Sequence, residues 1–241
     1  ASFLSIFALI SFFIFLIVSK YSHKIRYGAL LDKDFLKPQA FHDAPITRSG
    51  GVAAIFSLSI FFVIYYLLYS KVLYNYIFVS YSMFLVGFLD DLKIDIKPFT
   101  RLIIMVLLLF LFIYILPIKI LNIDVPFLIP LMSSHIFSSI FVLLCFLFVI
   151  NGANLIDGFN GLLAINLIII NIILAYINMN NENLEFSIFL ISQIIILLSF
   201  LLFNFPSAKI FLGDSGAYMF GALTSLNTII TNNLNPKISS F

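Results

Sequence analysis

Carboxylate and amide side chains are concentrated at three places in this sequence where they could bind a cation or a phosphate group. Asp90 and Asp91 form an adjacent pair that is followed by lysine and arginine residues. Asp157 lies in the polar stretch 151–161, and Asp214 lies between two glycines. Oxygen ligands from one or two carboxylates, completed by water and phosphate, suit Mg²⁺. These positions indicate a magnesium-binding cluster, with solvated interfacial charges as the simpler alternative for the Asp90–Asp91 pair.

The stretch 151–161 separates two long apolar runs and carries more polar groups than a connection needs. Its polar side chains recur every three residues, at Asn151, Asn154, Asp157 and Asn160, and glycines stand at positions 152, 158 and 161. The glycines favour an end or a bend of a helix. A single asparagine or aspartate is enough to cap a helix. We therefore interpret the four side chains as binding groups, with capping as the alternative.

Two further positions lie next to glycines where apolar segments begin. Asp214 stands at an expected helix start, where the positive end of the helix dipole favours anions and phosphates; capping of that helix is the alternative. Arg48 precedes Gly50 and Gly51 and could hold a phosphate. His42, in the same loop, would be an ordinary loop histidine if it stood alone.

The composition identifies a membrane protein. Of the 241 residues, 62% are hydrophobic and 10% are charged, whereas a soluble domain is about 45–50% apolar and about 25% charged. Segments near the ~20 residues needed to cross a bilayer recur along the chain. In lipid the backbone must satisfy its own hydrogen bonds, so an all-α, polytopic transmembrane bundle of about eight helices is expected. The expected segments are 3–19, 51–69, 74–89, 102–117, 135–150, 162–178, 186–203 and 217–231.

Lysine and arginine are distributed unevenly between the connections of these segments. Taken alternately, one set of connections holds ten of the thirteen basic residues and the other holds three. The richer set comprises 20–50, 90–101, 151–161 and 204–216. Positively charged connections stay in the cytoplasm, so this set is expected to face it. Eight of the eleven acidic residues lie on the same side, where a cation or protons would have to reduce their repulsion.

The connections leave no room for a separate soluble domain, so we expect one integral membrane domain over residues 1–241. The chain begins at Ala1 inside an apolar run and ends in a loop-like stretch. We expect the chain to be truncated at the C-terminus, and its N-terminal sequence is compatible with truncation there as well. The single cysteine, Cys145, lies in an apolar run, which excludes a disulfide framework and a thiolate metal site within this sequence.

Four motifs in order resemble one enzyme family. They are HxxPxxRxGG at 42–51, GFLDDL at 87–92, NxxNxxDGxxGL at 151–162, and FLGDSG at 211–216 with Asn204 seven residues before Phe211. This order resembles the polyprenyl-phosphate N-acetylhexosamine-1-phosphate transferases of glycosyltransferase family 4. The resemblance covers residues 42–221. Each motif is short, but their order and their common predicted membrane face make the combination specific.

The resemblance implies an activity, a cofactor and partners. Members transfer a sugar-1-phosphate from a UDP-N-acetylhexosamine to undecaprenyl phosphate or another polyprenyl phosphate. They release UMP, use Mg²⁺ or Mn²⁺, and initiate a cell-envelope glycan. The implied location is the bacterial cytoplasmic membrane, with the active site facing the cytoplasm. The implied partners are these two substrates and the lipid bilayer, with no nucleic acid; a homodimer stays open.

The resemblance also implies roles for individual residues. Catalytic roles are implied for Asp90, Asp91 and Asp157. Metal binding is implied for Asp214 and Asp91. Substrate binding is implied for Asn204, Phe211, Asn154, Asn151, Arg48 and His42, with Phe211 at a position that stacks on uracil.

The sequence departs from the family pattern at several places, and two other function classes stay open. Asn160 stands where many members have a second aspartate, and the chain ends before a histidine-rich loop that members carry. A cation transporter is the non-enzymatic alternative, and it predicts carboxylates near the bilayer midplane. An intramembrane aspartyl protease is the enzymatic alternative, but Phe211 stands where its motif needs a glycine.

Overall fold

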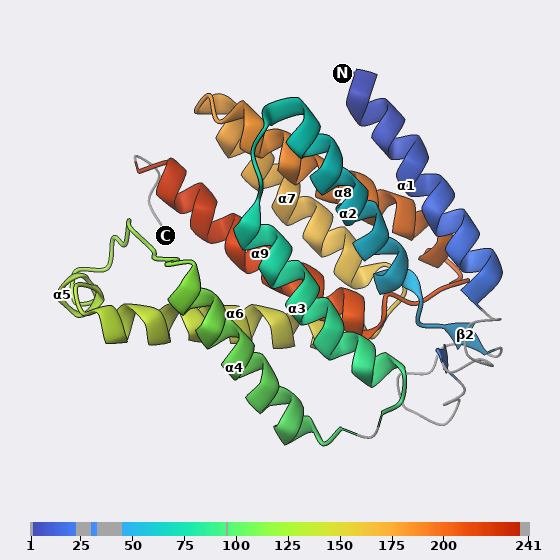
Figure 1. Ribbon diagram of the computed structural model, residues 1–241, viewed down its shortest axis with the longest axis horizontal. Helices are drawn as coiled ribbons and strands as arrows, with labels where there is room; N and C mark the ends of the chain where they lie inside the picture. The colour runs from blue at the N-terminus through green and yellow to red at the C-terminus, as the bar shows by residue number, and fades with distance from the viewer. Residues whose placement is uncertain (1, 23–29, 33–44, 95, 237–241) are drawn as a thin grey trace.

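The computed structural model describes residues 2–22, 30–32, 45–94 and 96–236, and these ranges form a helical bundle (Figure 1). The long helices are α1 (Ser2–Tyr21), α2 (Gly50–Tyr69), α3 (Tyr74–Asp91), α4 (Pro98–Ile115), α6 (His135–Ile156), α7 (Leu162–Asn180), α8 (Leu184–Asn204) and α9 (Gly213–Leu234). A short helix, α5 (Ile129–Met132), precedes α6. Strands β1 (Leu31–Asp32) and β2 (Ile46–Thr47) form a small antiparallel ribbon.

The predicted polytopic helical bundle is confirmed, and each expected apolar segment corresponds to one long helix. The largest difference concerns α6, which continues to Ile156 instead of ending near residue 150. Gly152 therefore lies inside a helix, which tolerates a glycine at a cost of about 1 kcal/mol relative to alanine. The break predicted from the glycines falls later, where Gly161 adopts a φ of 76° immediately before α7.

Helix α9 is the central helix of the bundle. It packs against α2, α3, α6 and α7, and most of its side chains are buried. Among the described residues, six helices are long and apolar enough to cross a membrane: α1, α2, α4, α6, α7 and α8. The amino-acid composition of α9 is more polar because protein, rather than lipid, surrounds it.

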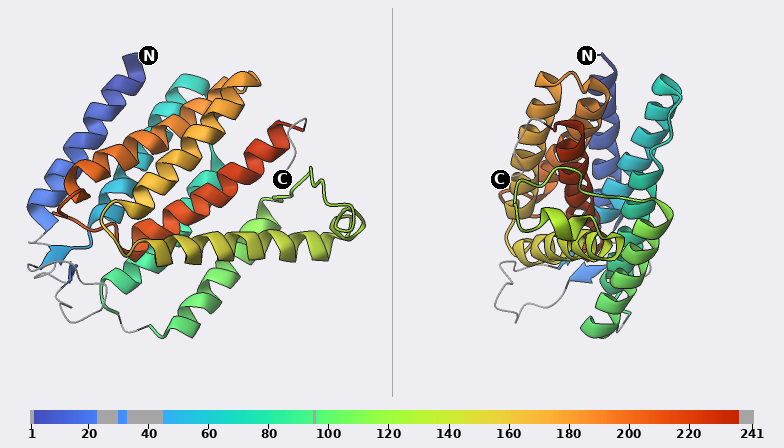
Figure 2. Two further views of the ribbon diagram at one scale, coloured as in Figure 1. Left: turned by 180° about the vertical axis from the view of Figure 1, so that it is seen from behind. Right: turned by 90° about the vertical axis from the view of Figure 1, so that its left-hand side faces the viewer.

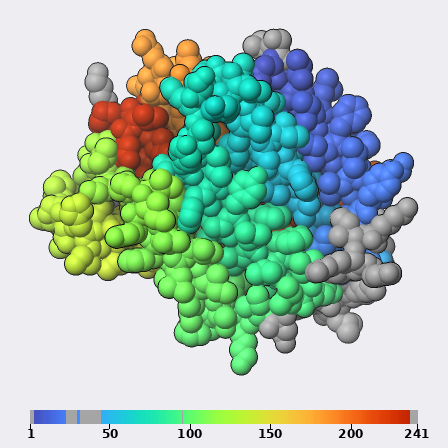
Figure 3. All heavy atoms as spheres, viewed as in Figure 1, coloured from blue at the N-terminus to red at the C-terminus, as the bar shows by residue number. Residues whose placement is uncertain are grey.

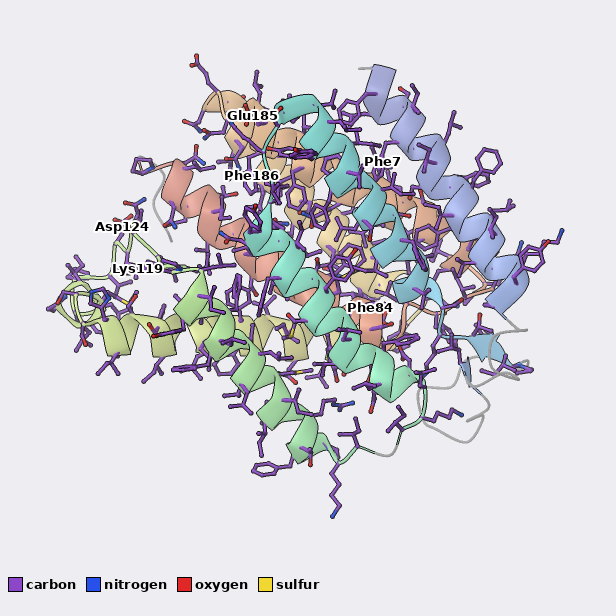
Figure 4. The ribbon with its side chains drawn as sticks, viewed as in Figure 1. Phe7, Phe84, Lys119, Asp124, Glu185 and Phe186 are labelled. Atoms are coloured by element: carbon purple, nitrogen blue, oxygen red, sulfur yellow. The ribbon has the colours of Figure 1, made fainter. Side chains whose placement is uncertain are left out.

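Contacts between loops show that successive long helices alternate in direction. At one end, the backbone N–H of Gly161 before α7 bonds to Asn204 at the end of α8, and Thr47 pairs with Ile210 before α9. At the opposite end, Lys71 forms an ion pair of 2.6 Å with Glu185, which is labelled in Figure 4. We call the first end, which carries Asp90, Asp91, Asp157 and Asp214, the acidic end. The two views in Figure 2 show the alternating helices from other sides.

Aromatic side chains fill much of the interior, and apolar side chains cover much of the outside. Phe7 of α1 packs edge-on against Phe61 of α2, with ring centroids 5.2 Å apart. Figure 3 shows a face covered largely by α2, α3 and α4. Exposed side chains on these helices include Phe56, Leu67, Leu85, Leu107 and Phe110. An apolar outer surface of this extent is the surface that lipid covers.

A cluster of buried amides joins α7, α8 and α9 inside the bundle. Asn227 Nδ2 donates to Asn171 Oδ1 at 3.1 Å and to Gln193 Oε1 at 2.9 Å. All three side chains are buried. Hydrogen bonds of this kind hold helices together where the hydrophobic effect between them is weak.

We expect Asn227→Ala to lower the free energy of unfolding by about 1–2 kcal/mol, because it leaves two buried amides without their partner. Thermal unfolding of the detergent-purified protein measures the change. Asn166→Ala is the matched control, since the exposed Asn166 side chain donates to the Leu162 carbonyl of its own helix. Equal unfolding temperatures for the two variants would show that the cluster does not stabilise the bundle.

Candidate active site

The start of α9 is capped by a carboxylate from α3. The backbone N–H groups of Asp214 and Ser215 donate to Asp91 Oδ1 and Oδ2, each at 3.0 Å. Asp91 is only 1% exposed. A carboxylate satisfies the unpaired N–H groups at a helix start and is stabilised by the positive end of the helix dipole. Asp91 therefore fixes the position of α9 relative to α3.

Glycines allow the backbones to come this close. Gly213 has a φ of 76°, and a Cβ added there would lie 2.6 Å from Asp91 Oδ2. A Cβ on Gly87 of α3 would collide with the backbone carbonyl of Asp214. The glycine before Asp214 is thus required both by its backbone conformation and by the Asp91 carboxylate.

Asp214 does not cap its own helix, so that alternative is wrong. Its Oδ1 atom accepts a hydrogen bond of 3.0 Å from Asn154 Nδ2 on α6. Its Oδ2 atom lies 3.1 Å from Arg101 Nη1 at the start of α4. With Asp91 taking over the cap, the Asp214 carboxylate is directed at groups from two other helices.

Arg101 also binds Asp90. The same Nη1 atom lies 2.6 Å from Asp90 Oδ2, and the guanidinium carbon lies 5.5 Å from the centre of the Tyr218 ring. Arg101 was not predicted from the sequence as a site residue. One feature of the sequence could have indicated it. Arg101 lies at the start of the helix that follows the Asp90–Asp91 pair, and the start of that helix must lie at the same end of the bundle as the pair.

The loop that carries Arg48 lies directly against the start of α9. The backbone N–H groups of Gly50 and Gly51 donate to the carbonyls of Phe211 and Leu212, both at 2.8 Å. Arg48 Nη1 lies 3.8 Å from Asp91 Oδ1. The structure therefore brings Arg48 and Phe211, which the resemblance assigns to substrate binding, next to the Asp91–Asp214 pair.

Asn204 is used by the protein's own backbone. It is 3% exposed, its Oδ1 accepts from the Gly161 N–H at 2.6 Å, and its Nδ2 donates to the Ile210 carbonyl at 2.9 Å. It therefore ties the turn before α7 to the loop that carries Phe211. This geometry supports a positioning role for Asn204, where the resemblance implies a place in the nucleotide pocket.

The polar stretch 151–161 divides at the end of α6. Asn154 reaches Asp214, whereas the exposed Asn151 donates to the Leu147 carbonyl of its own helix at 2.7 Å. Asp157 follows the helix end, where burial, with Asp214 and Asp91 nearby, raises its pKa well above the usual range of an aspartate. Asn160 donates to the Pro206 carbonyl at 3.1 Å, so it connects loops at the acidic end. His42 lies outside the described residues.

Comparison with known proteins decides the family of this chain. Residues 73–232 match the model of glycosyl transferase family 4. The match covers more than half of the chain and includes α3 through most of α9, and with them Asp90, Asp91, Asp157 and Asp214. The chain belongs to glycosyl transferase family 4. The resemblance inferred from the four motifs is confirmed.

Several relatives of this glycosyl transferase family 4 member share one name. The phospho-N-acetylmuramoyl-pentapeptide-transferase of Clostridium perfringens is 29% identical over 218 residues, covering 86% of this chain and 68% of the relative. The enzyme of the same name from Clostridium beijerinckii is 28% identical over 215 residues, covering 83% and 64%. That from Leuconostoc citreum is 41% identical over 80 residues, covering 33% and 25%. The chain thus spans about two thirds of the length of the Clostridium relatives.

The donor set of the acidic end fits a small divalent cation in part. Asp90 and Asp214 direct carboxylate oxygens at the same positive group, and carboxylates are the ligands that Mg²⁺ takes together with water and phosphate. Within the part of the chain that the structure describes, no three His, Cys, Asp or Glu side chains gather closely enough to hold a metal alone. Water or a substrate phosphate would have to complete the coordination.

Proposed function

We propose that this protein transfers a sugar-1-phosphate from a UDP-N-acetylhexosamine to undecaprenyl phosphate and releases UMP. The observation that carries the proposal is the meeting of four separate segments at the start of α9. Arg48, Asp91, Asn154 and Asp214 come from these segments and are connected by hydrogen bonds or ion pairs. Membership of glycosyl transferase family 4 and the name of the relatives point to the same reaction class.

The reaction joins two phosphates. A phosphate oxygen of the lipid attacks the sugar-bearing phosphorus of the donor and forms a new P–O bond. The bond from that phosphorus to the oxygen shared with the uridine-bearing phosphate breaks, and the oxygen leaves with UMP. Enzymes accelerate phosphoryl transfer mainly by positioning the reactants and stabilising charge. When bound, Mg²⁺ or Mn²⁺ would reduce the repulsion between the two phosphate groups.

The residues of the acidic end divide this work in the proposal. Asp90 and Asp214 are the cation ligands, and Asn154 orients Asp214 through its hydrogen bond. Asp91 holds the start of α9 in place, so we assign it a positioning role rather than direct metal ligation. Arg48 offers a guanidinium to a substrate phosphate. Phe211 offers a ring for stacking on uracil, in a loop that Asn204 holds.

The proposal also covers the location of the protein and the sugar that it transfers. Residues 1–241 act as one membrane domain in the bacterial cytoplasmic membrane, with the acidic end facing the cytoplasm, because the basic residues concentrate at that end. The name of the Clostridium relatives favours phospho-N-acetylmuramoyl-pentapeptide as the transferred group over phospho-N-acetylglucosamine. The product would then be a lipid-linked sugar that initiates a cell-envelope glycan.

UMP release by the detergent-purified protein, with undecaprenyl phosphate and Mg²⁺, tests the function. The donors are UDP-N-acetylmuramoyl-pentapeptide, UDP-N-acetylglucosamine and UDP-N-acetylgalactosamine. We expect UMP only when the lipid phosphate is present, and with the pentapeptide donor above the others. UMP from another donor alone would overturn the choice of sugar. The transferase function would be contradicted if neither this chain nor a version extended at its C-terminus released UMP from any donor.

A further inference from the structure

Arg101 is the positive group that lies against two carboxylates of the acidic end. Its Nη1 atom lies 2.6 Å from Asp90 Oδ2 and 3.1 Å from Asp214 Oδ2. The three side chains are only 22%, 26% and 19% exposed, in the order Arg101, Asp90, Asp214. Water screens these charges incompletely, so each carboxylate depends on a nearby cation.

The guanidinium lies where a cation bridging the two aspartates would have to lie. A cation held by Asp90 Oδ2 and Asp214 Oδ2 together would need the space between these two oxygens, which the Arg101 guanidinium fills. Two cations held this close would also repel each other strongly. Arginine does not lose its proton in proteins. The guanidinium must therefore move for the carboxylates to bind another cation.

We propose that Arg101 and a divalent cation bind the Asp90–Asp214 pair in exchange for each other, and that Arg101 thereby sets the cation affinity of the site. This inference rests on the proposed function, because it takes Asp90 and Asp214 as the cation ligands. In the empty pair, Arg101 offsets part of the negative charge and so preserves the site. When Arg101 leaves the pair, its planar guanidinium presents N–H donors whose geometry suits a phosphate.

Mn²⁺ binding tests the exchange without any measurement of activity. The signal of free Mn²⁺ in electron paramagnetic resonance, recorded as the cation is added to the detergent-purified protein, gives the dissociation constant. We expect Arg101→Gln to lower this constant about tenfold, because the competing charge is gone. Arg101→Lys keeps the charge and loses the fork, so it is expected to lie between the wild type and Arg101→Gln.

Lys97→Gln is the matched control. Lys97 precedes α4, is exposed, and carries the same charge near the same helix start. If Arg101 acts through its position between the aspartates, removing the Lys97 charge should change the dissociation constant by less than about twofold, since exposed charges are well screened. An equal gain of affinity in both variants would assign the effect to net charge and would overturn the exchange.

Thermal unfolding gives a second, independent readout. Without divalent cations, Arg101→Gln should unfold at a lower temperature than the wild type, because Asp90 and Asp214 then repel each other. Saturating Mg²⁺ should raise its unfolding temperature by more than it raises that of the wild type, since a tighter ligand stabilises more. If Arg101→Gln does not fold, the same comparisons with Arg101→Lys carry the test.

The failure of this inference differs from the failure of the proposed metal site. Mn²⁺ binding that Asp214→Asn abolishes, but that neither Arg101 variant strengthens, overturns only the exchange. Mn²⁺ binding that Asp214→Asn leaves unchanged overturns the assignment of Asp214 as a cation ligand, and the exchange with it. Tighter binding in both Arg101 variants, lost again when Asp214→Asn is added, supports both.

Discussion

Asp214→Asn is expected to reduce UMP release by at least about 10²-fold, because the proposed site then loses a carboxylate that would hold the cation that offsets the charge of the phosphates. The substitution keeps the size of the side chain. It removes the negative charge that pairs with Arg101, while the Asp91 cap of α9 uses only the backbone of residue 214. The helix should therefore stay in place and the loss should be chemical. The initial rate at saturating donor and lipid phosphate measures it.

Asp124→Asn is the control for this experiment. Asp124, labelled in Figure 4, is exposed in the connection between α4 and α5, at the end of the bundle opposite Asp214. It makes the same chemical change away from the acidic end, so its rate should equal that of the wild type. The loss of a key electrostatic group is expected to lower the rate far more than about threefold. If the rate of Asp214→Asn is within about threefold of the wild type, Asp214 does not belong to the proposed site.

Gly213→Ala should lower the free energy of unfolding by about 2–4 kcal/mol. An L-residue at a φ of 76° is strained, and the new Cβ would lie 2.6 Å from a carboxylate oxygen of Asp91. Either α9 shifts or the buried carboxylate loses its two N–H donors. Both outcomes displace Asp214, so UMP release should fall as well. Thermal unfolding and the UMP assay measure the two effects.

Gly152→Ala is the matched glycine control. Gly152 lies within α6, and a Cβ added there would be more than 4 Å from the other described parts of the bundle. Alanine in a helix interior is favoured over glycine by roughly 0.5–1 kcal/mol, so this variant should be slightly more stable than the wild type. A Gly213→Ala protein as stable and active as Gly152→Ala would show that the Asp91 cap does not hold the site.

The position of the carboxylates also bears on the alternative functions. A cation transporter is expected to carry its acidic side chains near the middle of the membrane, on broken helices. Asp90 and Asp91 end α3, Asp157 follows the end of α6, and Asp214 begins α9. All four lie at helix ends on one side of the bundle. This arrangement suits a reaction between a water-soluble donor and a lipid at the membrane surface.

The long helices were predictable because each depends on a local property. An apolar run of about twenty residues has to satisfy its own backbone in lipid, so it becomes a helix whatever its neighbours are. The same logic, with alternating connections, predicted that Asp90, Asp91, Asp157 and Asp214 would share one end. It did not predict the length of α6, since the glycine at 152 is compatible with a helix and the actual break depends on the turn at 157–161.

The partner of each polar group was not predictable, because partners come from helices far apart in the sequence. The sequence shows that Asp91 is a carboxylate near the end of a helix. Its use as the cap of α9 depends on how closely α3 and α9 pack. Arg101 looked like an interfacial charge until the start of α4 was placed beside Asp90 and Asp214. Local sequence therefore sets which elements form and which chemical groups they carry. Long-range packing selects which of those groups meet, since hydrogen bonds and ion pairs form only within about 3–4 Å.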